Sequence, residues 1–295
     1  MADWGKGVNN DIGWGQGGTN DIGYGSIYAV SNSGLTLLLQ DESFFLNTFT
    51  GASLGLSLVK LRKEYTGFCI KVRRSSDNAT QDIGFVNGVL DTASLLTFAG
   101  SGDAFVTIIY DQVGTKNMTQ TTANLQGQIV SNGSVILNGG KPCIIRSAND
   151  NGGYLSSYAP NGGATVKGVF YIGDNESRDR SIMFGSLNSA NDFAFAAVNN
   201  DASSIDSNLS ITSTKLNGNS VTINNRTEAF NFTNSQFLLY RETEFSFQNN
   251  VLALGYRQNS PAGFGMFTFQ ELLIFENTDN AEAKINNRNS IYNIY

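Results

Sequence analysis

Short apolar runs separated by turn residues dominate the second half of the chain. From about residue 125 onward, alternating or apolar runs recur between clusters such as Asn138-Gly139-Gly140 and Asn217-Gly218-Asn219. Runs of this kind bounded by Gly and Asn predict strands joined by turns, and many of them in series predict a β-sandwich. The predicted strands cover residues 134–137, 167–172, 181–184, 193–198, 209–212, 220–223, 236–241, 244–247, 251–256 and 265–275.

The first half mixes helical and strand patterns. Leu54, Leu58 and Leu61 recur at helical spacing and predict a short amphipathic helix over residues 51–63. Asp91 stands where an N-cap is expected and predicts a second helix over residues 90–99. Further predicted elements are strands over 67–74 and 105–110 and a closing helix over 282–292.

A ten-residue repeat occupies residues 1–28. The aromatic-glycine pairs Trp4-Gly5, Trp14-Gly15 and Tyr24-Gly25 recur at this period, and Asn-Asp-Ile-Gly precedes the second and third pairs. The segment has too little apolar content to bury a core alone, so its aromatics must pack on another copy, on the rest of this chain or on a larger assembly. The alternative is a disordered Gly-rich tail. The predicted anchor residues are Trp4, Gly5, Gly7, Ile12, Trp14, Gly15, Gly17, Ile22 and Tyr24.

These patterns divide the chain into three predicted parts. They are a repeat anchor over residues 1–35, a connector over 36–60 and a β-sandwich over 61–295. Asn, Ser, Thr and Gln supply most of the polar surface, because charged residues make up only 15% of the chain. Since Asn, Gly, Ser and Thr favour turns, loops and strands over helices, composition supports the all-β class.

Composition also limits the chemistry. The chain has no histidine and two cysteines, which excludes a Ser-His-Asp site, a His-ligated metal and a four-cysteine metal site. Any catalysis must use carboxylates, Tyr, Lys or Ser. We expect no cofactor and no metal, because the oxygen-rich runs 149–151 and 174–176 fit plain Asx turns better than a calcium site.

Charge and hydropathy bear on partners. A net charge of −6 argues against nucleic-acid binding, which needs a basic surface. No apolar stretch reaches the length of a membrane span, and the opening residues lack the apolar core of a secretory signal. We therefore expect neither nucleic acid nor a membrane as a partner.

Adjacent arginines on the strand predicted over 67–74 suggest an ion-pair network. Side chains alternate along a strand, so one of Arg73 and Arg74 points inward and needs carboxylate partners. Asp77, Asp82 and Asp111 are the acids available. We predict a structural network of these five residues that holds the turn over 75–79.

Several stretches resemble known modules. Tyr65-Thr66-Gly67, residues 72–79, 81–85 and 90–93, and Tyr110-Asp111-Gln112 resemble a module of bacteriophage virion proteins. They are also distantly similar to the catalytic domain of α-L-arabinofuranosidase B, a resemblance that implies a concanavalin-like jelly roll. The ending over 269–295 resembles the last strand and closing helix of concanavalin/laminin-G-like sandwiches. The opening repeat resembles the N-termini of structural proteins from phages of Bacteroidetes hosts.

The resemblance to virion proteins implies a function without catalysis. On this hypothesis the chain is a head or tail fibre or decoration protein, assembled in the host cytoplasm and located in the virion. Residues 1–35 would bind capsid, collar or tail proteins, and a homotrimer would display the sandwich for host attachment, with a surface glycan as a possible ligand.

A glycoside hydrolase is the alternative. Such enzymes need two carboxylates, about 5–5.5 Å apart for retention and about 6.5–9.5 Å apart for inversion, and they need no histidine. Glu242, Glu244 and Asp111 are candidates, because Glu242 and Glu244 share one face if a strand continues through them. The resemblance itself assigns no catalytic position in this sequence.

Overall fold

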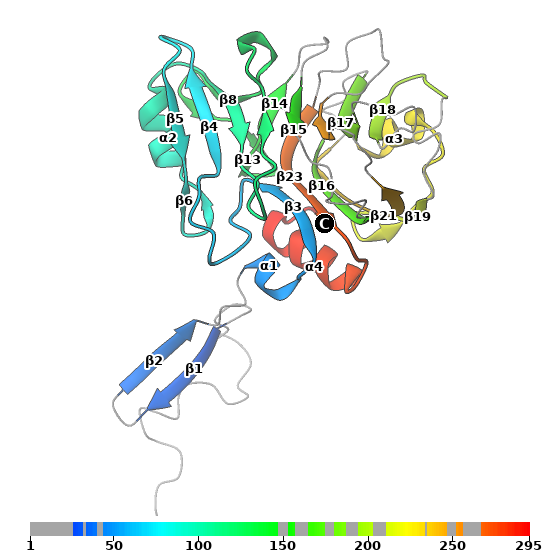
Figure 1. The fold of residues 1–295 in the computed structure, drawn as a ribbon, viewed down its shortest axis with the longest axis horizontal. Coiled ribbons are helices and arrows are strands. Elements are labelled where there is room, and N and C mark those ends of the chain that lie inside the picture. The colour runs from blue at the N-terminus through cyan, green and yellow to red at the C-terminus, as the bar shows by residue number, and fades with distance from the viewer. Residues whose placement is uncertain are drawn as a thin grey trace, which may run out of the picture.

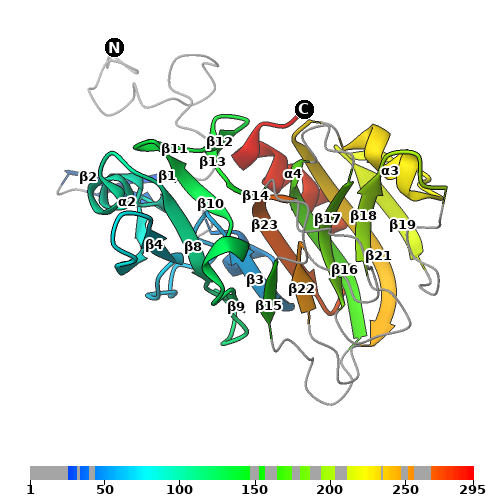
Figure 2. The same ribbon diagram turned by 90° about the horizontal axis from the view of Figure 1, so that it is seen from above.

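Two β-sheets packed face to face form the body of the protein (Figures 1 and 2). The computed structural model describes residues 26–31, 34–39, 44–146, 153–156, 165–174, 180–186, 194–202, 211–233, 235–246, 252–255 and 267–295. The all-β sandwich predicted from the sequence is confirmed. Residues 1–25, which hold the predicted anchor residues, lie outside the described part.

Sheet A contains the longest strands, and all its pairings are antiparallel. Its order is β19 (Ile211–Leu216), β21 (Phe237–Ser246), β16 (Thr165–Asp174), β23 (Phe267–Phe275) and β3 (Ala52–Ser57), and β20 (Asn219–Ser220) forms a hairpin with β19.

Sheet B faces sheet A and is also antiparallel. Its order is β5 (Thr80–Ile83), β4 (Ile70–Arg74), β8 (Ala104–Ile109), β9 (Met118–Thr119), β15 (Tyr154–Ser156), β22 (Leu252–Leu254), β17 (Arg180–Ser186) and β18 (Ala194–Val198). The strands β10 (Gln128–Ser131) and β14 (Ile144–Arg146) join β8 to β23, so hydrogen bonds run continuously from one sheet to the other.

Short hairpins and helices complete the fold. The hairpins are β1 (Ser26–Ser31) with β2 (Gly34–Leu39), β6 (Phe85–Val86) with β7 (Val89–Leu90), and β12 (Leu137–Asn138) with β13 (Lys141–Pro142), and β11 (Ser134–Val135) pairs with β10. The helices are α1 (Phe45–Thr48), α2 (Thr92–Ala99), the 3-10 turn η2 (Ala123–Leu125), α3 (Arg226–Phe232) and α4 (Ala281–Tyr292).

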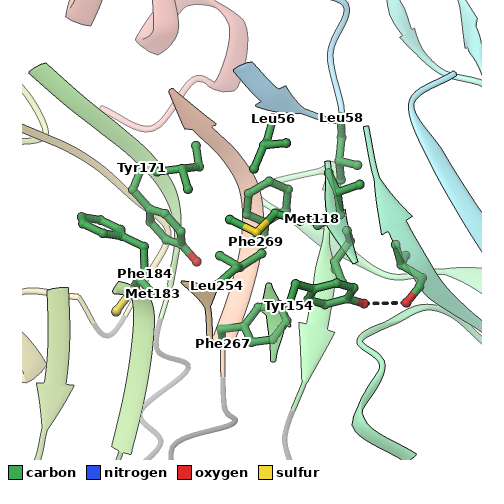
Figure 3. Close-up of a cluster of buried hydrophobic side chains, with 14 of the residues drawn as sticks. Leu56, Leu58, Met118, Tyr154, Tyr171, Met183, Phe184, Leu254, Phe267 and Phe269 are labelled. Atoms are coloured by element: carbon green, nitrogen blue, oxygen red, sulfur yellow. Dashed lines mark hydrogen bonds between the residues drawn. The ribbon is translucent and has the colours of Figure 1, made fainter. Parts of the chain in front are cut away.

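The main core fills the space between the two sheets (Figure 3). Tyr171 of β16 lies 5.9 Å, centroid to centroid, from Phe184 of β17, which brings the two sheets into direct aromatic contact. The buried hydroxyl of Tyr171 donates to the Thr268 carbonyl at 2.6 Å, and that of Tyr154 donates to the Val106 carbonyl at 2.7 Å. These bonds satisfy groups that would otherwise be costly to bury.

A second core lies on the outer face of sheet A, where α1 and α4 pack (Figure 1). Within this apolar layer, Glu271 of β23 is 0% exposed. Its carboxylate accepts hydrogen bonds from Ser57 of β3 at 2.7 Å, from Arg288 of α4 at 3.1 Å and from Tyr292 of α4 at 3.3 Å. Burial, followed by the nearby Glu271 carboxylate, raises the pKa of Tyr292 well above its usual value, so this phenol stays a donor.

The predicted helix over residues 51–63 is wrong. Residues 52–57 form strand β3, which pairs with β23 inside sheet A. Leu54 and Leu56 point into the core between the sheets, so burial on a strand explains leucines that also fit a helical spacing. The sandwich therefore includes part of the segment that the sequence predicts as a connector.

The other predicted helices are confirmed. Helix α2 begins after Asp91, whose side chain accepts from the Ser94 amide at 2.9 Å, and α4 closes the described chain. Helix α3 is not predicted from the sequence, although Asn225 caps it by accepting from the Glu228 amide. Among the described residues, no helix is long and apolar enough to cross a membrane.

We predict that Arg288→Met destabilises the fold by about 3–5 kcal/mol, because it leaves the Glu271 carboxylate buried without its cation. Lys215→Met is the matched control: it removes the ion pair with Glu282, whose side chain is 65% exposed, and should cost less than about 1 kcal/mol. Urea unfolding of both variants measures the difference. Equal losses would contradict a dominant role for the buried pair.

Candidate functional site

Arg74 and Asp77 form the closest pair in the predicted ion-pair network. Two guanidinium nitrogens of Arg74 contact the two Asp77 oxygens at 2.8 and 2.6 Å, and Asp77 also accepts from the Ala79 amide at 3.0 Å. The hydrogen bond from Arg74, with the Ala79 amide next in importance, lowers the pKa of Asp77 to about 2. This pair closes the turn after β4.

The structure separates the other predicted members. Arg73 donates to Gln126 at 2.8 Å and to Asn78 at 2.9 Å, and its guanidinium lies over the Phe105 ring. Asp82 accepts from the Tyr110 hydroxyl at 2.6 Å and pairs with Lys71 at 3.5 Å. Arg73 and Asp82 therefore take part in distinct local contacts.

Asp111 binds backbone amides. It is 2% exposed, and its two oxygens accept from the amides of Gly55, Val113, Gly114 and Lys116 at 2.9–3.1 Å. These bonds close the turn after β8 and tie it to β3. Because both oxygens are occupied in this way, Asp111 is a structural residue and a poor candidate for the acid or base of a hydrolase.

The other two candidate carboxylates lie on β21. Both stand on the strand Phe237–Ser246, two residues and therefore about 7 Å of backbone rise apart, but the register of this strand shifts next to Glu242 against both β16 and β19, so strand alternation does not assign the two side chains to one face. Glu242 is half-buried and accepts from the Tyr240 hydroxyl at 2.9 Å, and Glu244 is exposed. Burial and Glu242 raise the pKa of Tyr240 far above its usual value, so Tyr240 remains the donor.

Small residues flank Glu242 in the sheet. Gly168 of β16 and Ser213 of β19 are its register partners. A side chain at position 168 would meet the Asn277 carbonyl at 3.1 Å from its Cβ, which explains why a glycine stands there. The glycine therefore permits a close approach of the Asn277 carbonyl and of the Tyr240 and Phe275 side chains beside Glu242.

A polar cavity lies beside the same strands. It has a volume of about 510 Å³ and is lined by residues 211–214 of β19, by residues 220–224 and by Arg241. Arg241 is buried, with its guanidinium 5.6 Å from the Phe195 ring. Hydroxyls of Thr and Ser line most of the remainder, and no carboxylate occurs among these described lining residues.

Sequence reasoning missed this cavity. Thr212 and Thr214 follow a strand pattern and Arg241 stands in an apolar run, but only the pairing of β19 with β21 brings them together. That pairing joins two strands that are separated in the sequence by a hairpin and by α3, and no local sequence pattern predicts it.

The described residues contain no group of three or more Cys, Asp or Glu side chains placed to hold a metal ion. Of the two oxygen-rich runs, residues 149–151 lie outside the described residues. In the other, only Asp174 is described, and it is buried at the end of β16.

Comparisons with known proteins point to one enzyme group. A sequence profile described as "Alpha-L-arabinofuranosidase B, catalytic" matches residues 56–149. No curated protein matches the chain. The sequence is therefore distantly similar to the arabinofuranosidase B catalytic domain over part of its length.

Solved structures extend the similarity to most of the sandwich. One is a glutamate-to-glutamine variant of GH54 α-L-arabinofuranosidase soaked with 4-nitrophenyl α-L-arabinofuranoside, with a TM-score of 0.54 and 13% identity. Another is an arabinofuranosidase complexed with arabinofuranosyl-α-1,2-xylobiose, with a TM-score of 0.53 and 16% identity. Each alignment covers 82% of this chain and 63% of the other, so the chain corresponds to less than two thirds of those proteins.

These findings correct the leading functional prediction. The similar family and structures are arabinofuranosidases, so the hypothesis of a non-enzymatic phage virion, head-fibre or tail-fibre protein is wrong, and so is the prediction that the chain is not an enzyme. The features behind that hypothesis, low charge and many turn residues, are common to β-sandwiches. The lack of histidine is equally compatible with a two-carboxylate hydrolase.

We predict that Arg74→Gln raises the pKa of Asp77 from about 2 toward its ordinary value of about 3.9, because the guanidinium hydrogen bond is lost. A folded-state pKa below the unfolded one means that Asp77 stabilises the fold above pH 4, and that this contribution disappears as the pH falls toward 2. An NMR titration of the Asp77 carboxyl carbon measures the shift. Arg73→Gln is the control and should leave the titration unchanged; a shift of equal size there would refute the pairing.

Proposed function

We propose that this chain is a glycoside hydrolase that acts on α-L-arabinofuranosides. The single observation that carries the proposal is the similarity of its sandwich to arabinofuranosidase structures over 82% of the chain. The profile match over residues 56–149 supports it independently from the sequence. Fold alone does not specify chemistry, so the proposal also needs residues able to perform it.

Glu242 and Glu244 are the carboxylates that we assign to the reaction. They stand two residues apart on β21, about 7 Å of backbone rise, which places both carboxylates within reach of one sugar ring. The Tyr240 hydroxyl orients Glu242, which would take the proton of the attacking water. The exposed Glu244 would donate a proton to the leaving-group oxygen.

Substrate would then bind beside Glu242 on β21. Ser213, which pairs with Glu242 in the sheet, also lines the polar cavity. This register partner of Glu242 on β19 has a side chain too short to obstruct a sugar ring. A furanose could therefore approach the carboxylates from solvent.

We predict that the purified chain releases 4-nitrophenol from 4-nitrophenyl α-L-arabinofuranoside, and that Glu242→Gln and Glu244→Gln each lower the rate at least about 100-fold, since general acid–base groups contribute about 10²–10⁴-fold. Absorbance of the released nitrophenol measures the rate. Glu64→Gln, which alters an exposed carboxylate hydrogen-bonded to Asn47, is the control and should keep full activity.

Two results would count against this proposal. Binding of the arabinoside without release of nitrophenol would identify a carbohydrate-binding protein and overturn the hydrolase. Hydrolysis that persists in both glutamine variants would confirm the activity and refute the assignment of Glu242 and Glu244. Unfolding curves of the variants would show that any loss of rate comes from chemistry.

A further inference from the structure

An apolar groove lies on the surface between α2 and the β12–β13 hairpin. Its volume is about 570 Å³, and its apolar lining comes from β7, α2, β11 and the hairpin. Val89 at 47% and Leu137 at 57% exposure are among the most exposed large apolar side chains in the described part. Exposed apolar clusters of this kind mark interaction sites, so we expect the groove to bind another segment or molecule.

The chain enters the sandwich at the edge of this groove. Phe44 is the first residue of the long described segment, and its ring lies beside Gly88, the residue that precedes Val89. The Lys60 amide donates to the Gly88 carbonyl at 2.8 Å, and the Lys60 ammonium lies 5.4 Å from the Phe44 ring. These contacts fix the point from which the preceding residues extend.

The β1–β2 hairpin keeps the repeat close to that point. Ser26 pairs with Leu39, so the chain leaves the hairpin next to where it entered. Only residues 40–43 separate the hairpin from Phe44. With about 3.5 Å per extended residue and about 5 Å across the Ser26–Leu39 pair, Tyr24 can lie no more than about 30 Å from Phe44.

The repeat carries aromatic rings and acidic residues, which complement the apolar lining and the lysine of the groove. Residues 1–25 carry Trp4, Trp14 and Tyr24 and cannot bury these rings within themselves. The repeat also holds three aspartates against one lysine, and Lys141 is the charged residue in the described lining of the groove. A tethered segment further benefits from an effective concentration of about millimolar.

We propose that the groove is the intramolecular docking site of residues 1–25. Aromatic rings of the repeat fill the space between Val89, Leu96 and Leu137, and the acidic residues of the repeat lie near Lys141. This packing covers the exposed apolar side chains and gives the repeat a binding surface on its own chain. The proposal does not depend on hydrolase activity.

The two tryptophans of the chain provide a direct probe. Both lie in the repeat, so intrinsic tryptophan fluorescence of the full chain reports on the repeat alone. We expect a blue-shifted emission and slow acrylamide quenching in the unaltered protein. Leu137→Glu and Val89→Glu should each move the emission toward that of solvent-exposed indole and raise the quenching constant at least about twofold, because a charge in the groove opposes docking of an aromatic ring.

Leu155→Glu is the matched control, since Leu155 is a 38% exposed leucine on β15 and does not line the groove. Its spectrum should equal that of the unaltered chain, and Trp4→Phe would assign the signal to Trp14. A solvent-like emission in the unaltered protein, or an emission unchanged by both groove variants, would overturn the proposal. A blue shift that vanishes on dilution, together with a dimer in light scattering, would assign the groove to a second copy and overturn intramolecular docking.

Discussion

The buried carboxylate of Glu271 determines how the outer helices meet the sheet. A charge removed from water is tolerated only with a close counter-ion and hydrogen bonds. Here Ser57 comes from β3, whereas Arg288 and Tyr292 come from α4. The Arg288 guanidinium also lies 4.0 Å from the Phe45 ring of α1. Four elements must therefore be in place together, which selects one position of α4 among the many that an apolar layer alone would accept.

A β-bulge places Glu271 on that face. Ile172 pairs with Glu271 and Gly173 pairs with Phe269, so Gln270 is an extra residue in β23. Its buried side-chain amide accepts from Gln236 at 2.7 Å and donates to the Asn138 carbonyl at 3.0 Å, and its backbone carbonyl accepts from the Leu58 amide at 3.1 Å. Without the bulge, Phe269 and Glu271 would point to the same side of the sheet. The bulge therefore allows an aromatic ring inside the sandwich and a carboxylate outside it.

Local signals explain which features could be predicted from the sequence. Turn clusters locate the strands, Asp91 marks the start of α2, and the proximity of Asp77 to Arg74 in the chain leads to their pairing. Leucine spacing fails at β3 because Leu54, Leu58 and Leu61 fit a helical period, whereas Leu54 and Leu56 also alternate with Ser53, Gly55 and Ser57 as strand residues do. The polar cavity and the Glu271 cluster were beyond sequence reasoning, since each depends on partners from distant strands. The prediction of a virion protein was wrong because low charge and many turn residues are properties of a β-sandwich surface and carry no information about a catalytic site.

The position of β23 has a consequence for how the protein is made. This strand pairs with β16 on one side and with β3 and β14 on the other, and all three precede it in the chain. Until β23 arrives, each of these strands has an open edge that can pair with another chain. During most of its synthesis the chain therefore lacks the strand that connects β3 to β16. Insertion of β23 between them completes sheet A. Assistance from a chaperone would matter most in this interval, before that strand is available.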